Sequence, residues 1–166
     1  MRKIFVVATL VALVAVGGVA FTALSSAQAP QGQNAPQTKS ANIADAKAIT
    51  IWRDPGCGCC DTYAEYLEAN GFTVTRVDDR DFNKRSVDMG VPEKGLGCHL
   101  GEIDGYVVSG LVPVEIIERL VSERPDITGI TLPGMPGNAP GMARVKTGTL
   151  RTYSFGPKGV EVYSDE

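Results

Sequence analysis

Apolar and polar positions divide the chain into a long uncharged start, a polar stretch, and a region of strand-like and helix-like patterns. That region opens with a short β-leaning run at 48–52. A helical pattern follows from Cys60 to a glycine cap at Gly71. Residues 72–77 then alternate as a second strand, and 79–89 shows a polar, weakly helical pattern. The pattern therefore predicts strand, helix, strand and a short helix.

The pattern continues with a hairpin and a helix. Residues 100–103 and 106–111 alternate on either side of Asp104-Gly105, a dipeptide suited to a type I′ turn. Pro113 opens a helix that has an apolar stripe, and Pro125 ends this helix. The stripe consists of Ile116, Ile117, Leu120 and Val121. The order β-α-β-(α)-β-β-α is that of a thioredoxin-like domain, so we predict an α/β fold.

The remaining segments have weaker patterns. Gly95-Leu96-Gly97 is expected to be a flexible approach to Cys98. Residues 127–142 are rich in glycine and proline and are expected to form a loop. Residues 151–155 and 160–163 alternate around a Gly-Pro-Lys-Gly turn, which predicts a C-terminal β-hairpin extension of the core.

The first residues have the composition of an export signal. A positively charged start precedes the uncharged apolar run at 4–21, and small residues follow. We expect 1–27 to be a signal peptide cleaved after Ala27, or an N-terminal membrane anchor formed by 4–21. The domain is then periplasmic or otherwise exported.

Two further boundaries follow from composition. Residues 28–47 are rich in Gln, Asn, Ala, Pro and Ser and are expected to form a flexible linker. Residues 48–163 are expected to form one thioredoxin-like domain, and its cysteines make it a candidate metal-binding domain. The chain has a formal net charge of −3 and no basic cluster, which excludes nucleic acid as an expected partner.

Three of the four cysteines lie at the predicted junction between the first strand and the first helix, in Asp54-Pro55-Gly56-Cys57-Gly58-Cys59-Cys60. Backbone N–H groups and the dipole at a helix N-terminus stabilise thiolates, which are nucleophiles and soft metal ligands. Disulfides among these three cysteines would close very short loops, which disfavours a purely structural role. The run predicts a reactive sulfur site and leaves metal binding and catalysis both open.

Redox catalysis would use Cys57 and Cys60 as a Cys-x-x-Cys pair. Cys57 would be the exposed nucleophile and Cys60 the resolving thiol. Cys59 complicates this interpretation, because it places a third thiol beside the pair and invites exchange or metal capture. Arg53 would favour a thiolate here, whereas the neighbouring acidic residues would oppose one.

Cys98 and His99 stand where a thioredoxin-like fold brings the start of its third strand against the Cys-x-x-Cys turn. Adjacent strand residues point to opposite faces, so we favour Cys98 as the ligand. His99 is either a further ligand or an ordinary, partly exposed histidine. Met135 and Met142 are either thioether ligands, which suit Cu(I), or apolar core residues.

Several motifs together resemble the CopG-type family of exported, copper-resistance-associated proteins, over about residues 49–142. Besides the cysteine run, they are Gly71-Phe72, Cys98-His99, Asp104-Gly105-Tyr106, Gly110-Leu111-Val112-Pro113, Leu132-Pro133-Gly134-Met135-Pro136 and Pro140-Gly141-Met142. The resemblance implies a thioredoxin-like fold and a role in copper redox handling. It also implies copper binding by a ligand set of Cys57, Cys59, Cys60 and Cys98, with His99 adjacent. One departure is Leu100-Gly101, where the family typically has Thr-Ala.

We therefore predict an exported copper-binding protein that sequesters Cu(I) or hands it on in copper homeostasis or resistance, with zinc bound less well. The main alternative is an enzyme, a thiol–disulfide or copper oxidoreductase that uses Cys57 and Cys60. A third is a docking module for a copper pump or oxidase. The expected partners are copper ions and an envelope copper pump, oxidase or chaperone.

Overall fold

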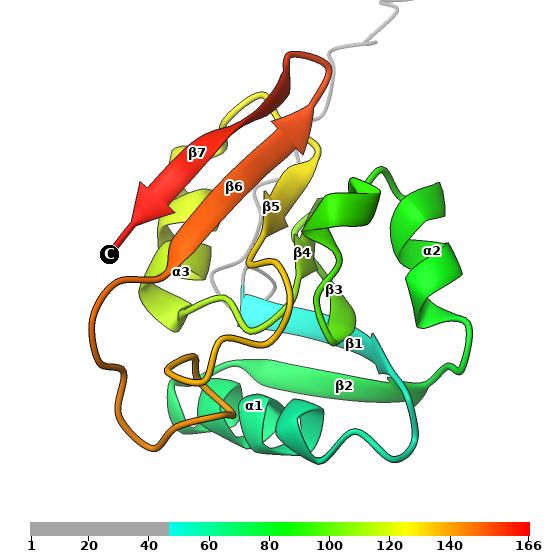
Figure 1. Ribbon diagram of the computed structural model, residues 1–166, viewed down its shortest axis with the longest axis vertical. Coiled ribbons are helices and arrows are strands. Elements are labelled where there is room, and N and C mark those ends of the chain that lie inside the picture. Colours follow the sequence, from blue (N-terminus) through cyan, green and yellow to red (C-terminus); the bar gives the residue numbers. More distant parts are fainter. Residues whose placement is uncertain (1–46) are drawn as a thin grey trace, which may run out of the picture. The chain divides into compact units, whose positions relative to one another are not determined.

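One mixed sheet of seven strands organises the residues that the computed structural model describes, 47–166 (Figure 1). The predictions for 1–27 and for nearly all of the linker at 28–47 fall outside the described residues. Within 47–166, no helix is both long enough and apolar enough to cross a membrane.

The first two thirds of the described chain contain both strands and helices, and the last third contains strands and loops. In order they are β1 (Ala48–Arg53), α1 (Gly58–Ala69), β2 (Thr73–Asp78), α2 (Phe82–Asp88), the 3-10 helix η2 (Glu93–Gly95), β3 (His99–Ile103), β4 (Tyr106–Ser109), α3 (Val114–Glu123), β5 (Gly129–Thr131), β6 (Arg151–Gly156) and β7 (Gly159–Asp165).

The strand order is β2-β1-β3-β4-β5-β6-β7. β1 and β2 are parallel, β3 is antiparallel to both of its neighbours β1 and β4, and β4 and β5 are parallel. The first four strands with α1, α2 and α3 form the predicted thioredoxin-like arrangement, which confirms the α/β fold class. The antiparallel strands β6 and β7 extend the sheet beyond β5 as the predicted C-terminal hairpin.

The sheet separates two clusters of buried apolar side chains. On one face, Ile49 and Ile51 of β1 pack in one cluster with residues of α1 and α3. On the other face, Leu100 and Val107 pack with Phe155 and with residues around α2 and η2. Figure 1 accordingly shows α2 on the opposite side of β3 and β4 from α3. This layering fixes α1 against the sheet, with its first turn at the end of β1.

The turn between β3 and β4 has the predicted type I′ geometry, with φ of 48° at Asp104 and 82° at Gly105. Four boundaries differ from the sequence prediction by two or three residues. α1 begins at Gly58 rather than Cys60, and α2 begins at Phe82 rather than 79. β4 ends at Ser109 rather than 111, and β7 runs to Asp165 rather than 163. Helix and strand ends are set by local hydrogen bonds that apolar periodicity does not encode.

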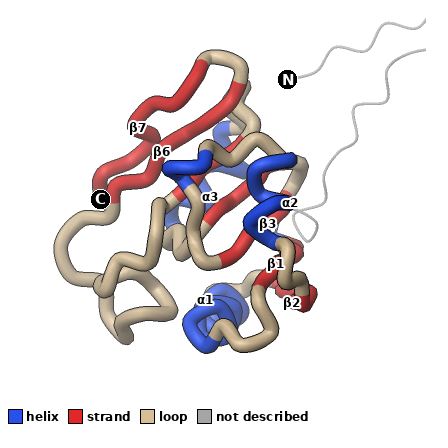
Figure 2. Tube along the Cα trace, turned by 45° about the vertical axis from the view of Figure 1, so that its right-hand side comes forward, coloured by secondary structure: helices blue, strands red, loops and turns tan. Residues whose placement is uncertain are grey.

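The prediction of a loop throughout 127–142 is wrong at β5. This strand has three residues, all buried between β4 and β6, so it shows no alternation of apolar and polar positions. Gly129 is required there, because a Cβ at this position would overlap the backbone carbonyl of Val107. The rest of the segment is a loop that Figure 2 shows reaching down beside α1.

Candidate metal centre

A turn stabilised by Asp54 sets the position of the cysteine run. The carboxylate of Asp54 accepts a hydrogen bond from Gly56 N at 2.9 Å, and its carbonyl accepts one from Cys57 N at 3.0 Å. The carbonyl of Cys57 then accepts hydrogen bonds from Cys60 N and Asp61 N, at 3.1 and 3.2 Å. Cys57 thus caps α1, and Cys59 and Cys60 lie in its first turn.

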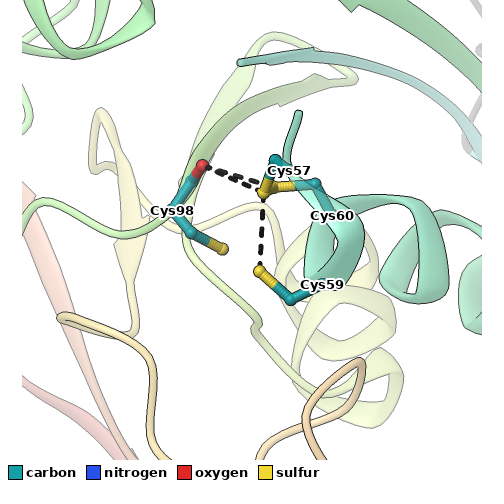
Figure 3. A group of neighbouring side chains, drawn as sticks. All are labelled: Cys57, Cys59, Cys60 and Cys98. Carbon is teal, nitrogen blue, oxygen red and sulfur yellow. Dashed lines mark hydrogen bonds between the residues drawn. A yellow bond between two sulfur atoms is a disulfide. The ribbon is translucent and has the colours of Figure 1, made fainter. Parts of the chain in front are cut away.

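Four cysteine sulfurs meet at this end of α1, as Figure 3 shows. The Sγ atoms of Cys57, Cys59, Cys60 and Cys98 all lie within 4.8 Å of one another. Cys57 and Cys60 form a disulfide, whereas Cys59 and Cys98 are free thiols. The structure therefore brings together the four cysteines that the sequence singled out, from two segments far apart along the chain.

Backbone packing on both sides of Gly97 fixes the position of Cys98. Gly97 N donates to Ser109 Oγ at 3.0 Å, and Gly97 pairs with Gly134 in an isolated parallel bridge. A Cβ on Gly97 would overlap the backbone of Gly110. The expectation of a flexible approach at 95–97 is therefore wrong, because this glycine permits close backbone contact. The pattern did contain the signal, a glycine directly before a candidate ligand.

Cys98 contacts the disulfide with its backbone as well as approaching it with its side chain. Its carbonyl oxygen lies 3.3 Å from Cys60 Sγ and 3.9 Å from Cys57 Sγ. Burial raises the pKa of the Cys98 thiol to about 12, and the nearby Cys59 adds to that shift. Cys98 is therefore protonated at neutral pH, and a metal ion that bound it would displace a proton.

His99 lies deeper than the sequence indicated. Its side chain is fully buried, and its ring centroid lies 4.8 Å from that of Tyr63. Nδ1 lies 3.5 Å from Cys98 Sγ, and Nε2 has no hydrogen-bond partner among the described residues. Burial lowers the pKa of His99 to about 3, so the imidazole is neutral at neutral pH. The alternative of an ordinary, partly exposed histidine is wrong.

Tyr63 forms one wall of the His99 site, a role that sequence reasoning did not assign. Its hydroxyl donates to the carbonyl of Val112 at 2.7 Å, and burial raises the pKa of Tyr63 well above its ordinary value. The helical periodicity placed Tyr63 on the apolar side of α1. It could not indicate that an imidazole would pack against the ring.

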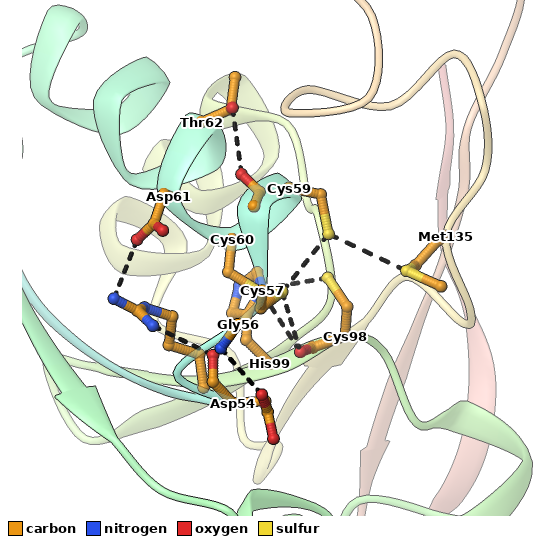
Figure 4. The surroundings of a disulfide bond; sticks show 12 residues. Asp54, Gly56, Cys57, Cys59, Cys60, Asp61, Thr62, Cys98, His99 and Met135 are labelled. Carbon is orange, nitrogen blue, oxygen red and sulfur yellow. Dashed lines mark hydrogen bonds and ion pairs between the residues drawn. A yellow bond between two sulfur atoms is a disulfide. The ribbon is translucent and has the colours of Figure 1, made fainter.

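The two loop methionines are exposed, Met135 by 56% and Met142 by 44%, so their interpretation as core residues is wrong. Met135 Sδ lies 4.0 Å from Cys59 Sγ, as Figure 4 shows. Met142 has no such contact with the four sulfurs in the described part of the chain. Only Met135 is placed beside the sulfur cluster.

The charged groups next to the cluster neutralise one another. The guanidinium of Arg53 forms ion pairs with Asp61 at 3.0 Å and Asp78 at 3.1 Å, and it donates to the Asp54 carbonyl at 3.0 Å. Arg53 is therefore engaged by acidic partners rather than directed at a thiolate. The sulfurs themselves, with the Met135 thioether and the His99 imidazole nearby, are a soft donor set suited to a metal such as Cu(I) or Zn(II).

Two solved structures are similar to this chain along nearly their whole length. One, titled "Copper resistance protein copG- Form 2", is 37% identical with a TM-score of 0.66, and the match covers 72% of this chain and 97% of that one. The other, titled "Copper resistance protein copG- Form 1", is 38% identical with a TM-score of 0.65, covering 72% and 96%. The chain belongs to the CopG family of copper resistance proteins.

This membership confirms the resemblance to the CopG-type family that the motifs indicated. A family model described as "Protein of unknown function, DUF411" also matches residues 96–142. That range contains Cys98, His99, Met135 and Met142. It does not include α1 or the cysteine run at the start of that helix. A comparison with curated protein sequences finds no match. The CopG likeness therefore extends over both segments that form the sulfur cluster, and the family model covers one of them.

Proposed function

We propose that this protein binds copper as Cu(I) and sequesters it or hands it on in the cell envelope. The observation that carries the proposal is the convergence of four cysteine sulfurs from two segments within 4.8 Å. Thiolates are soft ligands that favour Cu(I), and ligands from two anchored elements hold a fixed geometry. Two structures similar to this chain carry copper resistance in their titles, which supports copper as the metal.

The proposed ligands are four cysteines and one additional thioether. Cys57, Cys59, Cys60 and Cys98 are the principal ligands. Met135 adds a thioether that contacts the cluster through Cys59, and a thioether favours Cu(I) over Zn(II). His99 and Met142 were predicted as ligands as well. His99 Nδ1 lies 3.5 Å from Cys98 Sγ, so the imidazole packs directly against that thiol. Met142 has no contact with the cluster in the described part of the chain.

Copper binding by all four cysteines requires the reduced protein. In the disulfide form, Cys57 and Cys60 are joined, and only Cys59 and Cys98 can supply thiolates. Two-electron reduction of the disulfide releases the other two ligands at the end of α1. The reduced form is therefore expected to bind Cu(I) far more tightly than the oxidised form.

Competition against a calibrated Cu(I) chelator tests this proposal on metal-free protein under anaerobic conditions. Reduced protein should take Cu(I) from the chelator, and protein carrying the Cys57–Cys60 disulfide should lose at least about tenfold in affinity, because two ligands are missing. Zn(II) should bind the reduced form and be displaced by Cu(I). Reduced protein that fails to compete for Cu(I) would contradict the copper proposal.

A second candidate function is a thiol–disulfide or copper oxidoreductase. The observation that favours it is the disulfide between Cys57 and Cys60 at the N-terminus of α1. In that role Cys57, which is partly exposed, would be the attacking thiol, and the buried Cys60 would resolve the mixed disulfide. An insulin-reduction assay would detect this activity, and Cys57→Ser should abolish it.

The location and partner are proposed from the sequence. An export signal or anchor at 1–27 and a linker at 28–47 would place the domain in the periplasm, free to reach an envelope copper pump, oxidase or chaperone. Fractionation of cells that express the full chain tests the location. Recovery of the intact chain in the cytoplasm would contradict it.

A further inference from the structure

The sulfur cluster contains one disulfide and two free thiols. Cys59 Sγ lies 3.4 Å from Cys57 Sγ, one of the two sulfurs of the disulfide. That separation is within the range of reacting atoms held ready for attack. Cys98 Sγ lies within 4.8 Å of all three other sulfurs. Figures 3 and 4 both show the side chains of Cys59 and Cys98 pointing toward each other.

We propose that these four cysteines form an internal disulfide relay, in which the bond migrates from Cys57–Cys60 to Cys59–Cys98. In the first step the thiolate of Cys59 attacks Cys57 Sγ. The Cys59–Cys57 bond forms as the Cys57–Cys60 bond breaks, and Cys60 leaves as a thiolate that takes up the proton released by Cys59. No electrons enter or leave the protein in this step.

The second step transfers the bond to the distal cysteine. Cys98, which is a thiol at neutral pH, first gives up its proton; its thiolate attacks Cys59 Sγ, the Cys59–Cys98 bond forms, and the Cys59–Cys57 bond breaks. Cys57 leaves as a thiolate and takes up the proton that Cys98 released. The chain carries one disulfide and two thiols before and after the two steps, so no oxidant or reductant is needed.

One contact accommodates the thiol that the first step leaves at Cys60. Cys60 is 1% exposed, and the carbonyl oxygen of Cys98 lies 3.3 Å from its sulfur. Once Cys60 is a thiol, that carbonyl can accept its S–H, which satisfies a buried donor that the disulfide form lacks. Gly97 and its backbone contacts hold this carbonyl in place.

The relay gives the site an activity that metal binding does not require. With the disulfide stored between Cys59 and Cys98, Cys57 and Cys60 form a free dithiol at the end of α1. The relay involves only the four cysteine sulfurs and does not require bound copper, so we test it on metal-free protein.

Peptide mapping distinguishes the isomers, because trypsin separates Cys98 from the other cysteines. Cleavage after Arg53 and Arg76 yields residues 54–76, which contain Cys57, Cys59 and Cys60, and cleavage after Lys94 and Arg119 yields 95–119 with Cys98. Metal-free full chain is prepared with one disulfide and incubated without any added thiol or oxidant. Samples are quenched in acid, alkylated with N-ethylmaleimide, digested and analysed by mass spectrometry.

The relay predicts that a linked pair of these peptides accumulates with time, joined between Cys59 and Cys98, while the number of free thiols per chain stays constant. Cys59→Ser should reduce the linked pair at least about tenfold, because the relaying thiol is gone. Cys98→Ser should stop the bond within 54–76, in exchange between Cys57–Cys60 and Cys57–Cys59. Circular dichroism and melting temperature verify that each variant is folded, and Cys59→Ala replaces Cys59→Ser if that one is not.

Absence of the linked pair in the wild-type chain would overturn the relay. So would a linked pair that forms as fast in Cys59→Ser as in the wild-type chain, since Cys98 would then attack the disulfide directly. Neither result bears on Cu(I) affinity, which the chelator competition measures separately.

Discussion

Cys98 and His99 are neighbours in sequence, yet both lie at the same site at different depths. Alternation along a strand would have placed them on opposite faces. β3 begins at His99, so Cys98 precedes the strand and is not bound by its alternation. Cys98 consequently lies at the level of the sulfurs, and His99 lies beneath it against Tyr63.

The burial of His99 predicts a pH dependence of stability in the metal-free protein. Its pKa is about 3 in the folded protein, against an ordinary value of 6.5, so the unfolded chain binds a proton in this interval that the folded chain does not. Stability should therefore fall as pH falls below 6.5, by about 1.4 kcal/mol per pH unit. His99 is the single histidine of the chain, and chemical denaturation at pH 5.0 to 7.5 measures the slope.

The matched variant for this experiment is His99→Asn, which removes the titrating group. It should lower stability at pH 7 and flatten the dependence between pH 5 and 6.5. A wild-type protein with pH-independent stability across that interval would show that His99 has the same pKa in the folded and unfolded chains, and would contradict the effect of burial.

The two methionines form a second matched pair at the residue scale. Both are exposed, but only Met135 contacts Cys59. Met135→Leu should weaken Cu(I) retention severalfold, about 1 kcal/mol, because it removes a thioether and preserves volume. Met142→Leu should leave retention unchanged, and neither variant should shift the melting temperature appreciably. Equal effects of both substitutions on chelator competition would contradict the placement of Met135 at the site.

At the scale of elements, the site depends on how β3 and the loop after β5 meet. Gly97 packs its backbone against Gly110 and Gly134, and Gly134 N donates to Leu96 O at 2.9 Å. Gly141 brings the same loop against α1, since a Cβ there would lie 2.7 Å from the Cys59 carbonyl. The loop that carries Met135 is thus attached both to the Cys98 segment and to the helix that carries Cys59.

Gly97→Ala should therefore destabilise the protein and displace Cys98. The added methyl group overlaps backbone atoms, which cannot move as side chains do, so we expect a loss of about 2–3 kcal/mol. Gly137→Ala, in the loop after β5, is the control, because a Cβ there meets nothing within 4 Å. Denaturant unfolding of both variants measures the difference. A Gly97→Ala protein as stable as the wild type would show that this packing is not tight.

The sequence predicted the elements that show clear periodicity and missed the one that does not. α1 and α3 each have an apolar stripe, and the hairpin at Asp104-Gly105 has a distinctive turn, so these were predicted correctly. β5 has three buried residues and no alternation. Its existence depends on pairing with β4 and β6, which are distant in sequence, and local patterns do not encode such pairing.

At the scale of the whole molecule, the topology assembles the site. Cys57 and Cys98 are 41 residues apart, and they meet because β3 lies next to β1 in the sheet. Recognising a thioredoxin-like order was therefore enough to predict this proximity. The depth of His99, the fixed backbone at Gly97 and the exposure of the methionines depend on tertiary packing, so the sequence could not decide among their alternatives.

The copper content of a Cys98→Ser variant tests the central claim, that thiolates from two segments hold one copper site. Reduced full chain and variant are loaded with Cu(I) anaerobically, and metal per protein is measured beside disulfide-reduction activity on the same preparations. We predict that the variant loses most of its copper and keeps any dithiol activity of Cys57 and Cys60. These two cysteines lie next to each other at the N-terminus of α1, so their exchange does not require Cys98. Unchanged copper with lost reductase activity would contradict the account and make the protein an oxidoreductase in which Cys98 serves catalysis.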